Sequence, residues 1–400
     1  MGNVPNLRFP EFTGEWKQSL LKEYLVENKE RNTKGVFSKA EVLSVSGDKG
    51  IVNQIELLGR SYAGQSVLPY HIVRRNNIVY TKSPLSEFPY GIVKMNRGND
   101  GIVSTLYAVY SVQETAYPSF IEYYFASKDR TNRYFKPIVR IGAKHDMKIG
   151  NGEVLANMVR FPSIKEQRRI SEFLELIDKR IATQNKIIDK LQSLISGLND
   201  FLHLQVGGLS TSFEELGTSY SGLLGKSGDD FGKGKPYITY LNIYSNSIVN
   251  EEQVDYVIIG DNEKQNTLLY GDLLFTLSSE TPDEVGIGAV YLGESDKYYL
   301  NSFCFGLHMT ATNKVYSPYL AYLVSNSIFR KFIYPLAQGS TRFNLQKNDF
   351  MKKKFLLPTF ENQKEIARTL NALSSKLETD RKLLLNYQEQ KQYLLGAMFI

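Results

Sequence analysis

The sequence predicts an α+β fold with two globular mixed α/β domains, each followed by a long helix that pairs with the other as an antiparallel coiled coil. Two observations predict it: one heptad pattern occurs twice, and each copy follows a segment rich in β-branched and aromatic residues. We expect a first domain at residues 1–155, a helix at 160–203, a second domain at 204–355 and a helix at 358–400.

The long helices are predicted by apolar residues that alternate at spacings of four and three. The first seam comprises Ile170, Leu174, Ile177, Ile181, Gln184, Ile188 and Leu191. The second, 196 positions later, comprises Ile366, Leu370, Leu373, Leu377, Asp380 and Leu384. Polar residues at one matching position, Gln184 and Asp380, are typical devices that fix the register of a coiled coil.

A seam of this period buries itself only against another helix, and the partner is present in the same chain. A helix of about 40 residues would make a spacer about 60 Å long. The alternative is a pair of ordinary amphipathic core helices, but such helices rarely keep one offset over so long a stretch. Both copies also begin alike: Pro162 and Gln167 match Pro358 and Gln363, with Ser or Thr after each proline as a cap.

The two domains are predicted to share an order of elements. Strands are expected at residues 41–46, 72–82 and 102–112 and a helix at 117–127 in the first domain, with strands at 236–243, 272–277, 287–292 and 302–309 and a helix at 318–332 in the second. Side chains in the intervening loops differ almost everywhere. A similar framework with dissimilar loops indicates two modules that perform one task on different targets.

Positive charge is concentrated just before each long helix. Residues 128–148 hold seven basic and two acidic residues, and residues 330–354 hold seven basic residues and one acidic residue. Since the whole chain carries only +6, the remainder is acidic. One such stretch is usually a solvated surface, but two in matching positions favour binding of nucleic acid through its phosphates.

Several other classes of function are disfavoured. Cys304 is the only cysteine, which excludes an internal disulfide, and no apolar run is long enough for a membrane span. We therefore expect a cytoplasmic protein. The four histidines lack metal-ligand spacing and no catalytic motif is complete, so no catalytic or metal-binding residue is predicted. The glycine-rich stretch at residues 222–234 is interpreted as a mobile basic loop, because it lacks the pattern of a phosphate-binding loop.

The chain resembles the specificity subunit of type I restriction-modification systems. The resemblance rests on residues 162–167 with Ile170, on their second copy from Pro358, where Asn362 departs from the usual Glu, and on the polar stretch 338–345. It implies a non-catalytic subunit whose two domains each read one half of a split, asymmetric sequence in double-stranded DNA. It also implies two methyltransferase subunits and restriction subunits as partners, which would bind S-adenosylmethionine, ATP and magnesium, leaving no cofactor in this chain.

Base contacts are predicted for Lys144 and His145 in the first domain and for Ser340, Thr341, Arg342 and Asn344 in the second, because such side chains can read base edges. Phosphate contacts are predicted for Arg130, Arg133, Lys136, Arg330, Lys331 and Lys347. Two alternatives remain open at this stage. One is a coiled-coil scaffold that binds proteins and not DNA, and the other is a stand-alone nuclease or methyltransferase with an unfamiliar site.

Overall fold

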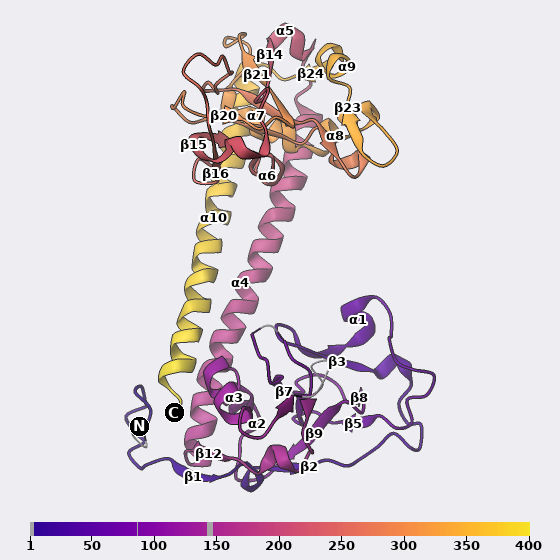
Figure 1. Ribbon diagram of the computed structural model, residues 1–400, viewed down its shortest axis with the longest axis vertical. Coiled ribbons are helices and arrows are strands. Elements are labelled where there is room, and N and C mark those ends of the chain that lie inside the picture. Colours follow the sequence, from indigo (N-terminus) through magenta and orange to yellow (C-terminus); the bar gives the residue numbers. More distant parts are fainter. Residues whose placement is uncertain (1–3, 86, 142–146) are drawn as a thin grey trace. The chain divides into compact units, whose positions relative to one another are not determined.

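The computed structural model describes residues 4–85, 87–141 and 147–400, which form the two compact units that Figure 1 shows. Unit 1 comprises Met1–Asn185 and Leu383–Ile400, and unit 2 comprises Lys186–Lys382. Each unit has a large hydrophobic core of its own, in which aromatic residues are prominent. The mixed α/β architecture with two long helices confirms the predicted fold class.

Both long helices form close to their predicted positions. Helix α4 spans Ile164–Gln205 and helix α10 spans Phe360–Ala397, so each contributes one part to unit 1 and another to unit 2. The hydroxyls of Ser163 and Thr359 accept hydrogen bonds from backbone N–H groups in the first turns of α4 and α10, at 3.4 and 3.3 Å. Such capping satisfies donors that a helix start leaves without an intrahelical partner.

The two helices run antiparallel within each unit. In unit 1, Leu174 near the start of α4 shares a core with Leu394 near the end of α10, and Lys391 lies 2.6 Å from Asp178. In unit 2, residues from the end of α4 share a core with Leu370 near the start of α10. The predicted seam residues are buried at Ile170, Leu174, Ile177, Gln184, Ile188, Leu370 and Asp380, and half-buried at Ile181, Leu191, Leu373, Leu377 and Leu384.

Unit 1 is built around a four-stranded antiparallel sheet in the order β2-β9-β6-β7. These strands are Leu25–Glu27, Tyr107–Val112, Ile78–Thr81 and Val93–Met95. Smaller antiparallel pairs are β1 (Lys17–Leu20) with β12 (Met158–Phe161), β3 (Leu43–Ser46) with β4 (Gly50–Asn53), β5 (His71–Val73) with β8 (Gly101–Val103), and β10 (Arg140–Ile141) with β11 (Met147–Lys148). The short helices are α1 (Gln54–Leu58), α2 (Pro118–Tyr124) and α3 (Lys128–Phe135).

Unit 2 repeats this plan with different additions. Its four-stranded antiparallel sheet has the order β14-β21-β17-β19, formed by Gly217–Ser221, Cys304–Met309, Leu273–Thr276 and Gly288–Val290. Further sheets join β13 (Leu209–Thr211) to β24 (Phe355–Leu357), β15 (Phe231–Ile238) to β16 (Val254–Val257) and β20 (Tyr299–Leu300), and β23 (Phe343–Leu345) to β18 (Ser278–Ser279) and β22 (Ala337–Gln338). The short helices are α5 (Phe213–Leu216), α6 (Tyr240–Ser245), α7 (Ser317–Ser325), α8 (Ser327–Ile333) and α9 (Lys347–Lys352).

The same hydrogen-bond frame surrounds the start of each long helix. In unit 1 the buried Gln167 amide donates to the carbonyls of Pro162 and Thr115 and accepts from the N–H of Tyr117. In unit 2, Gln363 forms the equivalent three bonds with Pro358, Lys314 and Tyr316. The repeated Pro and Gln of the sequence therefore tie the helix start to the loop before α2 or α7.

Several predicted elements proved to be two elements. The predicted strand 72–82 is interrupted at Asn76, whose φ of 68° turns the chain between β5 and β6. The predicted strand 102–112 divides into β8 and β9. The predicted helix 318–332 is broken at Asn326, because its side chain caps α8 by accepting from Ile328 N–H at 2.9 Å.

Two predictions in the first half of unit 2 were wrong. The predicted strand 236–243 ends at Ile238, since the hydroxyl of Thr239 caps helix α6. The segment 222–234, predicted as a mobile basic loop, contains a short 3-10 helix at Gly228–Asp230 and the start of β15. Its Lys226 ammonium lies 2.5 Å from the Glu263 carboxylate, which anchors the segment to a neighbouring loop.

No helix in the part of the chain that the structure describes combines the length and apolar character needed to cross a membrane.

Stability is expected to fall as the pH drops below 6.5, because two histidines are folded in neutral form. Burial lowers the pKa of His71 to about 4 and also lowers that of His203. His203 Nδ1 donates to the Asn199 carbonyl at 2.8 Å, so Nε2, 2.9 Å from the Tyr319 hydroxyl, must accept from it. A depressed folded-state pKa means that the unfolded chain binds the extra proton first, so the stabilisation is complete above pH 6.5 and is lost below it.

For His71 alone, the expected loss between pH 7.5 and 5.5 is about 1.4 kcal/mol, measured as the opening free energy of strand β5 by hydrogen exchange. A His71→Gln variant is the control, because it removes the titrating ring. An equal pH dependence in both proteins would contradict the assignment.

Candidate nucleic-acid interface

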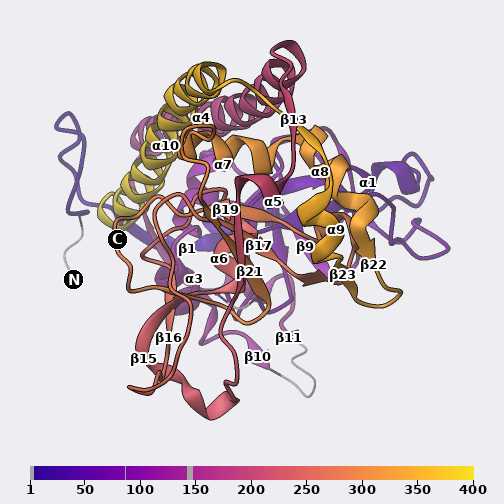
Figure 2. The same ribbon diagram turned by 90° about the horizontal axis from the view of Figure 1, so that it is seen from above.

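The predicted base-contacting residues of unit 2 lie on one hairpin. Strands β22 and β23 pair through Ala337–Leu345 and Gln338–Asn344, and β23 pairs on its other side with β18. Figure 2 shows β22 and β23 at an edge of unit 2 away from β15 and β16. The hairpin brings together four exposed side chains, those of Ser340, Thr341, Arg342 and Asn344.

Gly339 sets the shape of this hairpin. Its φ of 147° lies in the region that favours glycine, and a Cβ placed there would approach the Arg342 carbonyl oxygen to 2.0 Å. No side chain other than hydrogen fits that space. The glycine therefore allows the two strands to close tightly and presents residues 340–342 at the tip.

The other basic residues predicted in unit 2 differ in their surroundings. Lys331 is exposed. Lys347 is half-buried with its ammonium 5.1 Å from the centre of the Phe305 ring, and burial lowers its pKa. Lys347 thus has one protein contact and a partly exposed surface.

Arg330, which is predicted to contact phosphate, is half-buried and bonded within unit 2. Its guanidinium donates to three backbone carbonyls, those of Gly286, Asp283 and Val285, at 2.6 to 2.8 Å. Burial lowers its pKa. The sequence indicated a basic residue on a helix. It did not indicate the nearby loop, whose carbonyls accept hydrogen bonds from most of the N–H donors of this side chain.

Arg130 in unit 1, also predicted to contact phosphate, is likewise bonded within its own unit. The residue is only 7 % exposed, its Nε donates to the Tyr124 carbonyl at 2.9 Å, and its guanidinium carbon lies 4.7 Å from the Phe399 ring centre. Burial lowers its pKa to about 10. Arg130 therefore stabilises the packing of α3 against the end of the chain.

The remaining predictions in unit 1 stay predictions. Arg133 and Lys136 are exposed at the C-terminal part of α3. Lys144 and His145 lie outside the described residues, between β10 and β11. The pairing of Arg140 with Lys148 places that segment after α3, just as β22 and β23 follow α8 in unit 2.

Comparison with known proteins finds a family match within the second half of the chain. Residues 218–387 match the family model of the type I restriction modification DNA specificity domain. This part of the chain therefore resembles a DNA specificity domain.

Two solved structures share its fold over nearly the whole chain. The crystal structure of a type I restriction-modification S subunit from M. genitalium is 15% identical, with a TM-score of 0.53 and coverage of 99% of both chains. A chain from a study of complex assembly and conformational transition of the type I R-M system is 14% identical, with a TM-score of 0.57 and coverage of 95% and 96%. The match of residues 218–387 to a DNA specificity domain supports a DNA sequence-recognition subunit, and a scaffold without DNA binding is not favoured.

The sequence alone did not reveal the side chains that contact the β22–β23 hairpin of unit 2. Arg342 Nε donates to Ser278 Oγ at 3.2 Å, and its guanidinium carbon lies 5.6 Å from the Phe303 ring centre. Nearby, the Glu284 carboxylate accepts from the Tyr244 hydroxyl at 2.6 Å and the Ser279 hydroxyl at 3.0 Å. These residues come from separate elements, so no spacing in the sequence could have linked them.

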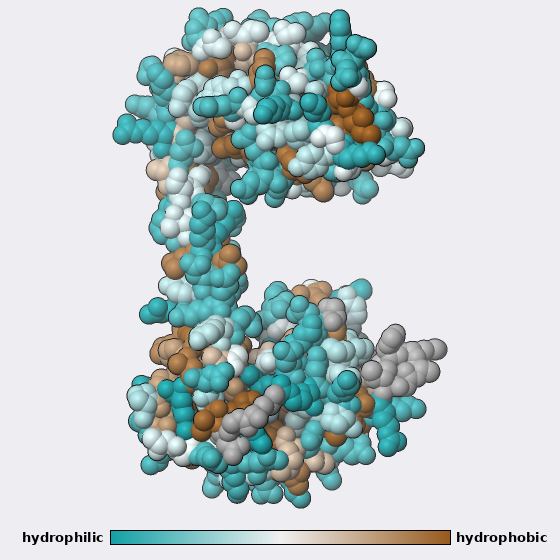
Figure 3. Space-filling view, turned by 60° about the vertical axis from the view of Figure 1, so that its left-hand side comes forward, coloured by the Kyte–Doolittle hydropathy of each residue, from teal (hydrophilic) through white to brown (hydrophobic). Residues whose placement is uncertain are grey.

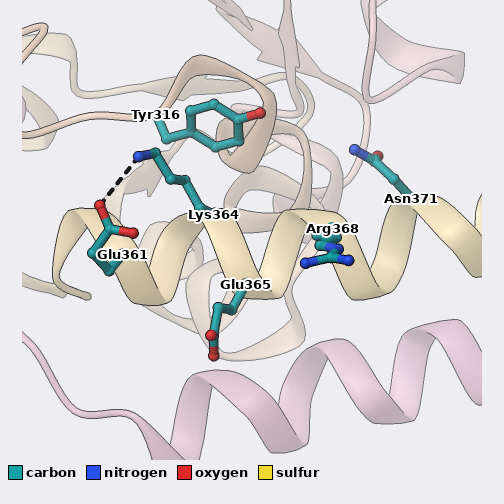
Figure 4. Close-up of a pocket in the computed structure, with 6 residues that line it drawn as sticks. All are labelled: Tyr316, Glu361, Lys364, Glu365, Arg368 and Asn371. Atoms are coloured by element: carbon teal, nitrogen blue, oxygen red, sulfur yellow. Dashed lines mark hydrogen bonds and ion pairs between the residues drawn. The ribbon is translucent and has the colours of Figure 1, made fainter.

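An open surface hollow of unit 2 lies on α10 and is shown in Figure 4. It is open, about 540 Å³ in volume, and lined by Tyr316, Glu361, Lys364, Glu365, Arg368 and Asn371. The Lys364 ammonium lies 3.1 Å from the Glu361 carboxylate, and two acids balance two bases. This mixed, exposed charge is characteristic of a protein-contact surface more than of a site for chemistry.

Two groups that could take part in catalysis, the Cys304 thiol and the Asp272 carboxylate, are buried in the fold. Cys304 is buried, and burial raises the pKa of its thiol, which suppresses the reactive thiolate. The Asp272 carboxylate is buried and accepts from the Tyr220 hydroxyl at 2.7 Å and lies 2.9 Å from His308 Nδ1. The described residues contain no group of three or more His, Cys, Asp or Glu that could hold a metal ion.

Proposed function

We propose that this chain is a specificity subunit that reads a split, asymmetric DNA sequence, with the globular part of each unit reading one half. The proposal rests on one observation. The same set of hydrogen bonds surrounds Gln167 in unit 1 and Gln363 in unit 2, while the surface residues of the two units differ. Because these hydrogen bonds are repeated, the globular part of each unit is attached to the start of its long helix in the same way. Different exposed side chains give these two readers different targets.

The long helices are proposed to hold the two readers at a set separation, and so to determine the spacing of the half-sites. One turn of DNA is about 34 Å, so a spacer of the expected length could place both readers on one face of the duplex. The partners are proposed to be two methyltransferase subunits and, for cleavage, restriction subunits. Exposed apolar residues on α4 suit helix-mediated docking: Leu176, Ile187, Leu194, Phe201 and Leu204. Figure 3 shows that brown, apolar areas occur among the hydrophilic surface of the molecule.

Catalysis is proposed to belong to those partners, which would bind S-adenosylmethionine, ATP and magnesium. The purified chain, incubated with DNA and these compounds, should neither transfer methyl groups nor cleave. Turnover by the chain alone, retained through successive purification steps, would identify it as a nuclease or methyltransferase instead.

Exchange of one reader is expected to change one half of the methylated sequence. The antiparallel pairs β1–β12 and β13–β24 bring together the ends of segments 17–161 and 209–357, so each segment can be replaced as a closed cassette. Replacing 209–357 by the equivalent segment of another specificity protein, with the methyltransferase co-expressed, should change one half-site and preserve the other. Methylated adenines are mapped by sequencing, and exchange of 17–161 is the matched control.

A motif unaltered by both exchanges would contradict the proposal. DNA binding measured at increasing salt provides a second discriminator. A DNA reader loses affinity in proportion to the phosphates it neutralises, with a log–log slope of about −0.9 per phosphate contact. A scaffold that binds only proteins would give no such slope.

A further inference from the structure

Arg342 is held from two sides before any ligand arrives. Its Nε donates to Ser278 Oγ at 3.2 Å, and one face of its guanidinium lies near the Phe303 ring, with 5.6 Å between carbon and ring centre. Among the described residues, these contacts involve the Nε of Arg342 and one face of its guanidinium group. The two terminal nitrogens lie at the other end of the fork, on an exposed residue.

Phe303 is placed by its backbone in spite of its exposure. More than half of the residue, 56%, is accessible, which is unusual for so large an apolar side chain. Its N–H donates to Asn301 Oδ1 and its carbonyl accepts from Leu277 N–H, both at 2.9 Å. The Leu277 carbonyl in turn accepts from Leu345 N–H at 2.8 Å. Phe303 is thereby tied to β23, the strand that directly follows Arg342.

Ser278 belongs to the same block. It is only 5% exposed, it pairs with Asn344 of β23, and its carbonyl accepts from the Tyr240 hydroxyl at 2.8 Å. Its hydroxyl therefore approaches Arg342 from a buried, well-supported strand. A long flexible side chain anchored in this way loses less rotamer freedom when it binds.

We propose that Phe303 and Ser278 are positioning residues that aim the terminal nitrogens of Arg342 at the O6 and N7 of a guanine in the major groove. The inference rests on the proposed function. A phosphate contact is less consistent with the surroundings, because Ser279, which pairs with Phe343, holds the Glu284 carboxylate close to the same hairpin. A carboxylate repels phosphate but can accept from a cytosine amino group.

The experiment maps adenine methylation in cells that express the full chain with its methyltransferase, using a library of motif variants. Arg342→Ala is expected to lower discrimination at one base pair by about 10-fold to 100-fold. Phe303→Leu and Ser278→Ala should lower discrimination about 3-fold to 10-fold at that same base pair and leave the other positions within 2-fold. Phe303→Trp, which keeps an aromatic face, should retain discrimination. Tyr270→Leu is the matched control, since Tyr270 is 58% exposed in the same unit.

A merely structural role predicts a different result. Uniform loss of methylation at all motif positions in Phe303→Leu, or loss centred on a base pair unaffected by Arg342→Ala, would overturn the inference. An intact split motif that Arg342→Ala leaves unchanged would overturn it while sparing the proposed function. Absence of any split motif with the unaltered chain would instead overturn the proposed function.

Discussion

Leu174→Ala is expected to lower the free energy of unfolding of unit 1 by about 3 kcal/mol, and Leu370→Ala to do the same in unit 2. Both side chains are fully buried, and both belong to cores that include strands and short helices of the globular parts. Truncation therefore removes apolar contact and leaves a cavity in the main core of one unit. Hydrogen exchange read by mass spectrometry, with urea as denaturant, separates the two units.

The matched controls are two leucines of α4 whose side chains face solvent. Leu176 in unit 1 and Leu194 in unit 2 are 58% and 52% exposed, so alanine there should change stability by less than about 0.5 kcal/mol. Equal effects at Leu174 and Leu176 would mean that the helix face is wrongly assigned. Destabilisation of unit 2 by Leu174→Ala, with unit 1 unaffected, would contradict the division into two cores.

Gln167→Ala and Gln363→Ala are each expected to cost about 3 kcal/mol in their own unit. Each substitution deletes two donated bonds and one accepted bond at a fully buried site. The carbonyls and N–H that remain would be buried without partners, and each such group costs about 1 to 3 kcal/mol before relaxation. Protection of the first turn of α4 or α10 in hydrogen exchange measures the effect.

Gln192 offers a control on α4, because it is an exposed helical glutamine. Gln192→Ala should be neutral within about 0.5 kcal/mol. If Gln167→Ala proved as mild as Gln192→Ala, the repeated frame would not be a source of stability. The loops before α2 and α7 should also lose protection, since Tyr117 and Tyr316 donate to the two glutamines.

Secondary structure inside the two globular parts was harder to predict than the helices. The apolar runs at 72–82 and 102–112 read as single strands, but each is divided by a turn that joins strands of different sheets. Hydrophobic runs report burial, and both halves of each run are buried, so the run alone cannot locate the turn. Asn326 and Thr239 could have been read as helix caps, yet their side chains cap only because tertiary packing bends the chain there.

The charged residues show a similar limit. Clustering in sequence placed Arg130 and Arg330 beside exposed lysines, but one is buried against an aromatic ring and the other binds loop carbonyls. Arginine has five donors and a flat apolar face, so it serves packing as readily as DNA binding. Arg342, by contrast, stays exposed at a hairpin tip.

The sequence by itself determined the duplicated heptads, the paired Pro and Gln at each helix start and the division into two domains with long helices, because periodicity and local capping are encoded in neighbouring residues. Only the tertiary structure decided which arginines remain at the surface and which partners aim Arg342. Ser278, Phe303 and Arg342 meet through strand pairing across more than 60 residues of chain, and contacts of that range depend on the folded topology.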